Sequence, residues 1–374
     1  MLRGLGLAFF FLFLCYPLIG QKSLSNLPNS DSIVSEISKS LYNQDYDGTK
    51  IKIDQLSKQL PEHPIVDLLY ALNIVWKTIP DGNPKEFPEM ERHLKNSIEK
   101  AELILDFNKE DVESTFFLLM AHGLLAQYYG EQGSSFKAIS EAKRAYNSVI
   151  KGIDMKEQYH EYYFSSGLYN YFREKQPQLH PVYKTFVWIF RSGSIEKGIA
   201  QLKYARKNAV LSKVEAGHYL AYIYMRNEND PEAAKVILNE LLDQYPNNTY
   251  FKMLKVECLD MTDQVEEIKY YLDEFLNHKQ EYVRMFGNAY CGVFAEKGEG
   301  DQRRALHFYR NALEIGKKFE DSGNHPKSVA YAGLGRIADA NNDEKGAIAF
   351  YKNARKIATA PKILEEAKAY LKNH

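Results

Sequence analysis

One stretch of the chain has the glycine spacing of a dinucleotide-binding turn. Gly333, Gly335 and Ala338 fit the pattern G-x-G-x-x-A, in which glycines let a backbone approach a pyrophosphate where a strand turns into a helix. The pattern needs a strand before it, whereas residues 328–341 have apolar side chains at helical spacing throughout. We therefore expect these glycines to serve helix packing, and the sequence predicts no cofactor.

Other residue types that carry chemistry are scattered. The ten histidines form no H-E-x-x-H motif, and no C-x-x-C motif is present, so no metal site is predicted. Cys258 and Cys291 are expected to be buried thiols, with a disulfide as the alternative in an oxidising compartment. Neither a G-x-S-x-G elbow nor a phosphate-binding loop occurs. The sequence thus favours a protein that is not an enzyme.

Aromatic side chains give the main candidate site. The chain has 27 tyrosines, and five of them crowd into residues 158–173. Adjacent residues on a helix point about 100° apart, so one apolar stripe cannot bury them all. Tyrosine, tryptophan and arginine are the types enriched at binding hot spots. The predicted partner-binding residues are Tyr162, Tyr163, Tyr169, Arg173, His180, Trp188 and Arg191.

The elements that must position these side chains are helices. From about Asp31 onward, apolar residues recur at helical spacing, and residues such as Pro, Gly and Asn interrupt them. In residues 328–358, the first helix carries Tyr331, Leu334, Gly335 and Ala338, and the second carries Ala347, Tyr351 and Ala354.

That unit resembles the tetratricopeptide (TPR) repeat, W-x2-L-G-x2-Y followed by A-x3-F, although Ala338 stands where Tyr is usual. Similar units recur toward the N-terminus. The resemblance implies an all-α, right-handed superhelical solenoid of about eight helix pairs with a C-terminal capping helix near residues 361–372. One pair, 158–173 and 195–208, is interrupted by an irregular insert at residues 174–194.

The N-terminus has the composition of an export signal. Arg3 precedes an uncharged apolar run over residues 5–19, and small Gly20 precedes the expected cleavage point. The predicted organisation is a signal peptide at 1–20, a short linker at 21–30 and the solenoid at 31–374. We expect a periplasmic, cell-surface or secreted protein, with an uncleaved N-terminal anchor as the alternative. No later apolar run is long enough to span a membrane, and peripheral association with a membrane complex stays open.

The formal net charge of −1, with Lys and Arg dispersed along the chain, argues against a nucleic-acid partner. The leading hypothesis is a non-enzymatic exported scaffold that binds a protein or peptide in a concave groove lined by the first helix of each pair. The alternative is a carbohydrate- or small-ligand-binding protein that uses the aromatic segment at 159–191 as a lid. A hydrolase with an unrecognised site is the third hypothesis.

Overall fold

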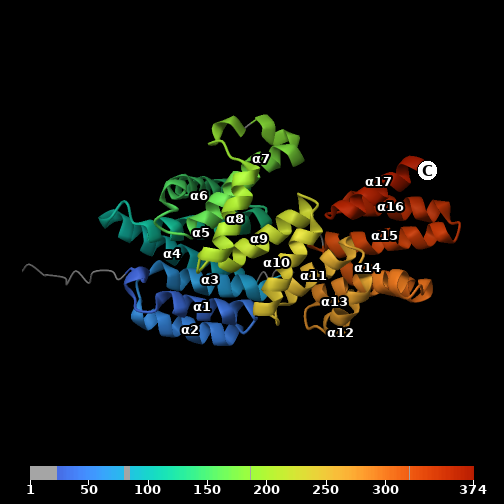
Figure 1. Cartoon of the computed structure of the whole chain (residues 1–374), viewed down its shortest axis with the longest axis horizontal. Coiled ribbons are helices and arrows are strands. Elements are labelled where there is room, and N and C mark those ends of the chain that lie inside the picture. Colours follow the sequence, from blue (N-terminus) through green and yellow to red (C-terminus); the bar gives the residue numbers. More distant parts are fainter. Residues whose placement is uncertain (1–22, 80–84, 186, 320) are drawn as a thin grey trace, which may run out of the picture.

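The computed structural model describes residues 23–79, 85–185, 187–319 and 321–374. All regular secondary structure in these ranges is helical (Figure 1). Consecutive helices pack as antiparallel pairs, and eight such pairs stack in chain order before one closing helix. The prediction of an all-α solenoid of eight pairs plus a cap is confirmed. The expected signal peptide at 1–20 lies outside the described residues.

The first helices of the pairs are α1 (Ser30–Tyr42), α3 (Pro64–Thr78), α5 (Val112–Glu131), α7 (Tyr162–Leu179), α9 (Lys213–Arg226), α11 (Thr249–Met261), α13 (Glu281–Val293) and α15 (Asn324–Ala340). The second helices are α2 (Tyr46–Gln59), α4 (Phe87–Phe107), α6 (Ser135–Met155), α8 (Ile195–Asn208), α10 (Pro231–Gln244), α12 (Val265–Leu276), α14 (Gln302–Gly316) and α16 (Glu344–Ile357). The closing helix is α17 (Pro361–Asn373).

A recurring turn sets the geometry of the pairs. In six of them, a residue with positive φ comes immediately before the N-cap of the second helix. In four of these, the cap is an aspartate whose carboxylate accepts a hydrogen bond from the backbone N–H three residues later: Asp45, Asp230, Asp301 and Asp343. The same local chemistry therefore repeats the same tight reversal along the chain.

The glycines of the G-x-G-x-x-A stretch are packing residues, as predicted. A Cβ atom on Gly333 would lie 2.2 Å from the ring of Tyr309, which is fully buried. Gly335 lies similarly close to the ring of Tyr351. Both glycines lie inside α15, where a side chain would collide with these rings. Their role is therefore to let the tyrosine rings pack closely against the helix.

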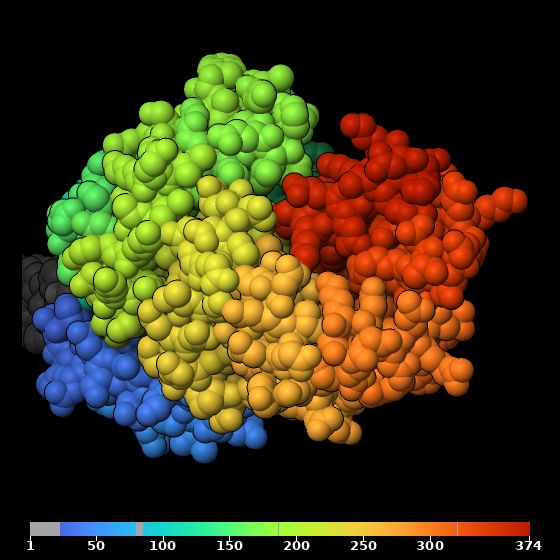
Figure 2. Space-filling model, turned by 45° about the vertical axis from the view of Figure 1, so that its right-hand side comes forward, coloured from blue at the N-terminus to red at the C-terminus, as the bar shows by residue number. Residues whose placement is uncertain are grey.

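The first turn of the superhelix closes on itself. The side-chain amide of Asn248, at the N-terminus of α11, donates to the backbone carbonyl of Tyr42 in α1 over 2.8 Å. The amide of Gln280, just before α13, donates to the carbonyl of Ile79 after α3 over 3.2 Å. Figure 2 shows the blue N-terminal atoms directly against the yellow atoms of the middle of the chain. The stacked pairs therefore enclose a space where an open solenoid would have a trough.

The described part of the expected linker is docked on the solenoid. Leu24 and Leu27 are buried, and η1 (Leu24–Asn26) lies against the start of α5. The carboxylate of Glu113 accepts hydrogen bonds from the backbone N–H groups of Leu24 and Ser25. This segment begins the apolar core.

Two helices are longer than predicted. Helix α7 does not end at Arg173 but runs through Pro177 to Leu179, so the irregular insert is confined to residues 180–194, with η2 (Pro181–Thr185) and η3 (Val187–Ile189). Proline lacks the N–H for one helical bond, but the turn continues because the His180 N–H donates to the Gln176 carbonyl. Helix α15 starts at Asn324, with Pro326 in its first turn, where proline is tolerated.

Cys258 and Cys291 are free and buried, as expected. Burial raises the pKa of the Cys258 thiol to about 11 and that of Cys291 to about 12, so both stay protonated near neutral pH. The Cys258 thiol donates to the Pro231 carbonyl over 3.0 Å. Both thiols are packing residues.

A network of buried polar side chains connects four successive first helices, α9, α11, α13 and α15. Arg226 of α9 pairs with Glu257 of α11, and His325 of α15 lies 3.5 Å from the same carboxylate and 3.1 Å from the hydroxyl of Tyr290 in α13. Burial, together with the charge of Arg226, lowers the pKa of His325 to about 4, although Glu257 opposes the shift. The imidazole is therefore neutral in the folded chain at neutral pH.

The lowered pKa of His325 in this network predicts that the stability of the fold depends on pH. Between the ordinary histidine pKa near 6.5 and the folded value of about 4, the unfolded chain binds a proton at His325 that the folded chain does not. The free energy of unfolding should fall as the pH drops through this window, by up to about 3 kcal/mol from this group. Chemical unfolding of the His325→Gln variant should show a smaller slope against pH, whereas His307→Gln, at an exposed histidine, should keep the wild-type slope. Equal slopes in all three proteins would contradict the assignment.

Candidate functional site

A large cavity lies inside the closed turn. Its volume is about 860 Å³, and we call it the axial cavity. Most of its lining comes from the inner faces of α3, α5, α7 and α9, with further contributions from α6 and from Tyr250 of α11 and Tyr282 of α13. The first helices thus line the concave surface, as the repeat pattern predicts.

The sequence of α5 explains why one wall of the cavity is apolar. This helix is apolar on nearly every face, so it can face the core on one side with Phe116 and Phe117 and the cavity on the other with Leu119, Met120 and Leu124. Gly123 also lines the cavity, and no atom lies within 4 Å of the position where its Cβ would stand. The absent side chain at Gly123 keeps part of the cavity open.

One carboxylate organises the polar part of the cavity wall. Glu215 of α9 accepts a hydrogen bond from the indole N–H of Trp76 over 2.9 Å and one from the hydroxyl of Tyr42 over 3.1 Å. Burial and the Glu215 charge together raise the pKa of Tyr42 well above its usual range, so this hydroxyl remains a donor. Glu215 therefore fixes α9 against α1 and α3 at the cavity wall.

Aromatic rings surround this carboxylate. The ring of His218 lies 6.0 Å from Trp76, 5.1 Å from Tyr219 and 5.3 Å from Tyr250, measured between centroids. The Nδ1 atom of His218 is buried without a hydrogen bond, and the nearest oxygen of Glu215 is 3.5 Å away. Burial raises the pKa of Tyr219 to about 12 and raises that of Tyr250 further, so both phenols stay neutral.

The charge of the axial cavity has one sign. Among the described residues that line it, Glu131 and Glu215 are the acidic ones, and there is no Lys or Arg. Aromatic faces next to a carboxylate attract cations, because the ring quadrupole and the negative charge act together. The arrangement is therefore suited to an apolar ligand that carries a positive group.

The structure separates the residues predicted from the tyrosine-rich segment. Tyr162 is fully buried in the core, where its hydroxyl donates to the Val112 carbonyl over 2.9 Å. Tyr163 packs on Tyr204 with ring centroids 4.0 Å apart and donates to Glu157. These two tyrosines lie at the start of α7, at the opposite end of this helix from the insert.

The other five predicted residues lie near one another at the insert. The Tyr169 hydroxyl donates to the Arg191 carbonyl, and Arg173 donates to the carbonyls of Val187 and Phe190. His180 and Trp188 are exposed on the outer part. Tyr169 alone of the seven also lines the axial cavity. Whether any of them binds a partner stays a prediction.

Sequence reasoning missed the central residues of the cavity. Trp76, Glu215 and His218 come from α3 and α9, which are separated by five intervening α-helices in the chain. The sequence of α5 carried a signal of the cavity. This helix is apolar on more of its surface than packing against neighbouring helices requires.

Comparisons with known protein families and with curated proteins find no match. Among solved structures, the chain is similar to a monomeric mutant of IFIT1 with Gppp-AAAA, at 15% identity and a TM-score of 0.36, over 92% of this chain and 69% of that one. It is also similar to the C-terminal part of a TPR repeat-containing protein from Cytophaga hutchinsonii, at 11% identity and a TM-score of 0.26, over 89% of this chain and 98% of that one.

A third similar structure is Naa15/Naa10 bound to HypK-THB, at 14% identity and a TM-score of 0.22, over 94% of this chain and 82% of that one. At such scores these likenesses support no argument about function. The TPR-like architecture of this chain is established by its own eight stacked helix pairs.

Filling the axial cavity should abolish uptake of an apolar probe without unfolding the protein. A Gly123→Leu side chain enters the cavity and also removes a helical glycine, so the free energy of unfolding should stay equal or rise by about 1 kcal/mol. Fluorescence titration with the neutral dye Nile red should show binding to the wild type and its loss in this variant. Gly130→Leu is the matched control, since Gly130 has similarly open surroundings on α5 but does not line the cavity. Equal dye binding by both variants would show that the dye binds elsewhere.

Proposed function

We propose that this protein is a non-enzymatic, exported scaffold that holds an extended, apolar and positively charged segment of a partner protein in its axial cavity. The observation that carries the proposal is the lining of that cavity, which is largely apolar and aromatic and includes carboxylates but no described cation. Export rests on the composition of the N-terminal segment.

The shape of the cavity supports a peptide segment as its occupant. First helices of successive repeats present one side chain after another along the inner surface, and this spacing suits an extended chain with alternating contacts. Apolar side chains of the segment would replace water against Leu124, Phe164 and Leu168. A lysine or arginine of the segment would meet Glu215 between aromatic rings.

The chemistry of the wall supports binding without turnover. The phenols of Tyr219 and Tyr250 are held neutral, so neither serves as a base near pH 7. Ser212, a hydroxyl of the cavity wall, donates to Glu161 over 2.5 Å and is not paired with His218. The carboxylates also disfavour a nucleic acid, whose phosphates they would repel.

A small apolar amine is the second candidate ligand, because a volume of about 860 Å³ lies within the range of small-molecule sites. This keeps the small-ligand alternative but moves it from the aromatic insert to the cavity. None of the described residues in 180–194 lines the cavity, whereas Phe164, Leu168 and Tyr169 of the aromatic segment at 159–191 do.

A matched pair of peptides tests the proposal. Short peptides of Leu, Phe and Lys should bind the wild type at least about tenfold more tightly than peptides of the same pattern with Glu in place of Lys. Isothermal titration calorimetry should show this preference reduced in Glu215→Gln, which keeps an oxygen for the Trp76 indole but loses the charge. Both peptides should lose binding in Gly123→Leu.

Dodecylammonium chloride serves as the small-molecule probe in the same titrations. Tight binding of this amine together with no binding of either peptide would favour the second candidate. Binding of the Glu peptide as strong as that of the Lys peptide, or binding that survives Gly123→Leu, would contradict a cation-selective cavity.

A further inference from the structure

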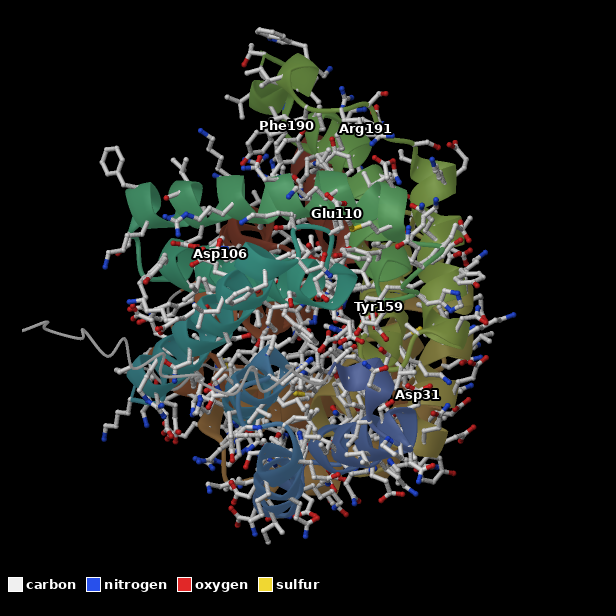
Figure 3. All side chains as sticks on the ribbon, turned by 90° about the vertical axis from the view of Figure 1, so that its left-hand side faces the viewer. Asp31, Asp106, Glu110, Tyr159, Phe190 and Arg191 are labelled. Atoms are coloured by element: carbon white, nitrogen blue, oxygen red, sulfur yellow. The ribbon has the colours of Figure 1, made fainter. Side chains whose placement is uncertain are left out.

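An apolar protrusion stands out from the body of the solenoid beyond the end of α7 (Figure 1). Its outer side chains are Val182, Tyr183, Trp188, Ile189 and Phe190, which are between 42% and 77% exposed. Figure 3 shows Phe190 and Arg191 where this segment joins the body, with the remainder extending away from it. Such a concentration of exposed large apolar side chains marks an interaction surface.

The protrusion is held in a defined shape. The guanidinium of Arg173 donates to the backbone carbonyls of Val187, over 3.1 Å, and Phe190. The Arg191 backbone N–H donates to the hydroxyl of Tyr146 over 3.2 Å, and the ring of Phe190 lies edge-on to the Tyr146 ring at 5.2 Å. An apolar surface held in one conformation by these contacts can bind a partner without a further loss of conformational entropy.

Three hydrogen-bond donors near the tip are paired within the protrusion itself. The Trp188 indole N–H donates to the Thr185 carbonyl over 3.0 Å, and the Thr185 hydroxyl donates to the Val182 carbonyl over 2.8 Å. The Tyr183 backbone N–H donates to the His180 carbonyl. Donors that are already paired in this way lose little hydrogen bonding when they leave water for a hydrocarbon environment.

The protrusion itself carries cations and no acidic side chain, with Arg191 placed where it joins the body. Residues 180–191 contain Lys184 and Arg191 and no Asp or Glu. Lys184 is exposed, and the Arg191 side chain is about half exposed, 3.6 Å from the exposed Asp154. Tryptophan and tyrosine beside cations are typical of segments that lie at the boundary between lipid headgroups and acyl chains.

We propose that this protrusion inserts Trp188, Ile189 and their neighbours into the interface of an anionic phospholipid bilayer and docks the scaffold there as a peripheral protein. Its convex shape fits a deformable surface better than a rigid pocket, and its cations match anionic headgroups. No helix in the described ranges is long and apolar enough to cross a membrane. The proposal is independent of the ligand, because no described residue of the protrusion lines the axial cavity.

Co-sedimentation with vesicles tests the proposal. The full chain should bind vesicles of phosphatidylcholine and phosphatidylglycerol more tightly than vesicles of phosphatidylcholine alone. The variant Trp188→Ser/Ile189→Ser should lose about tenfold or more of this binding. Phe136→Ser/Ile139→Ser is the matched control, because both residues are exposed on α6 away from the protrusion, and it should bind as the wild type. Lys184→Glu should weaken binding to the anionic vesicles only.

Tryptophan fluorescence supplies a second readout that does not depend on affinity. The chain has two tryptophans, and Trp76 is buried. Brominated acyl chains should quench Trp188, and Trp188→Phe should remove this quenching while the protein still sediments with vesicles. Absence of vesicle binding, or binding without quenching, would overturn the proposal. Capture of a soluble protein by the wild type but not by the double variant, without vesicle binding, would assign the protrusion to a protein partner and overturn it as well.

Discussion

The contact between the beginning and the middle of the chain is the constraint on which the rest of the structure depends. Glu215 of α9 accepts hydrogen bonds from Trp76 and Tyr42, and Asn248, the N-cap of α11, donates to the carbonyl at the end of α1. Each of these bonds joins residues more than a hundred positions apart. Without them, the same helix pairs would still stack with their neighbours, but the inner surface would be an open trough.

Closure also explains the chemistry of the cavity. A carboxylate taken out of water is costly unless donors compensate for its lost hydration, and the indole and phenol donors do so here. Because these donors are aromatic, the carboxyl group that closes the turn lies among aromatic rings. The interaction that stabilises the turn therefore creates the cation-selective character proposed for the site, and stability and binding depend on the same side chain.

Local features of the fold were predictable because they depend on local physics. Apolar spacing and the capping turns at Asp301 and Asp343 place helix boundaries to within a few residues. The closed turn was not predictable, since it follows from small rotations accumulated over several pairs, which no single motif encodes. For the same reason Glu215 was overlooked, and Tyr162 was ranked as a binding residue although its neighbours bury it. Trp188 is exposed because an aromatic residue in an irregular insert has no core to enter, and its role in binding a partner stays a prediction.

Solvent access to Trp76 tests closure most directly. In a chain carrying Trp188→Phe, Trp76 is the remaining tryptophan, and in the closed turn it is 2% exposed. We expect emission typical of a buried indole and weak quenching by acrylamide, with quenching increased in Asn248→Ala because a closing hydrogen bond is lost. Quenching of Trp76 as strong as that of free tryptophan in the otherwise native, helical protein would contradict closure, and with it the axial cavity.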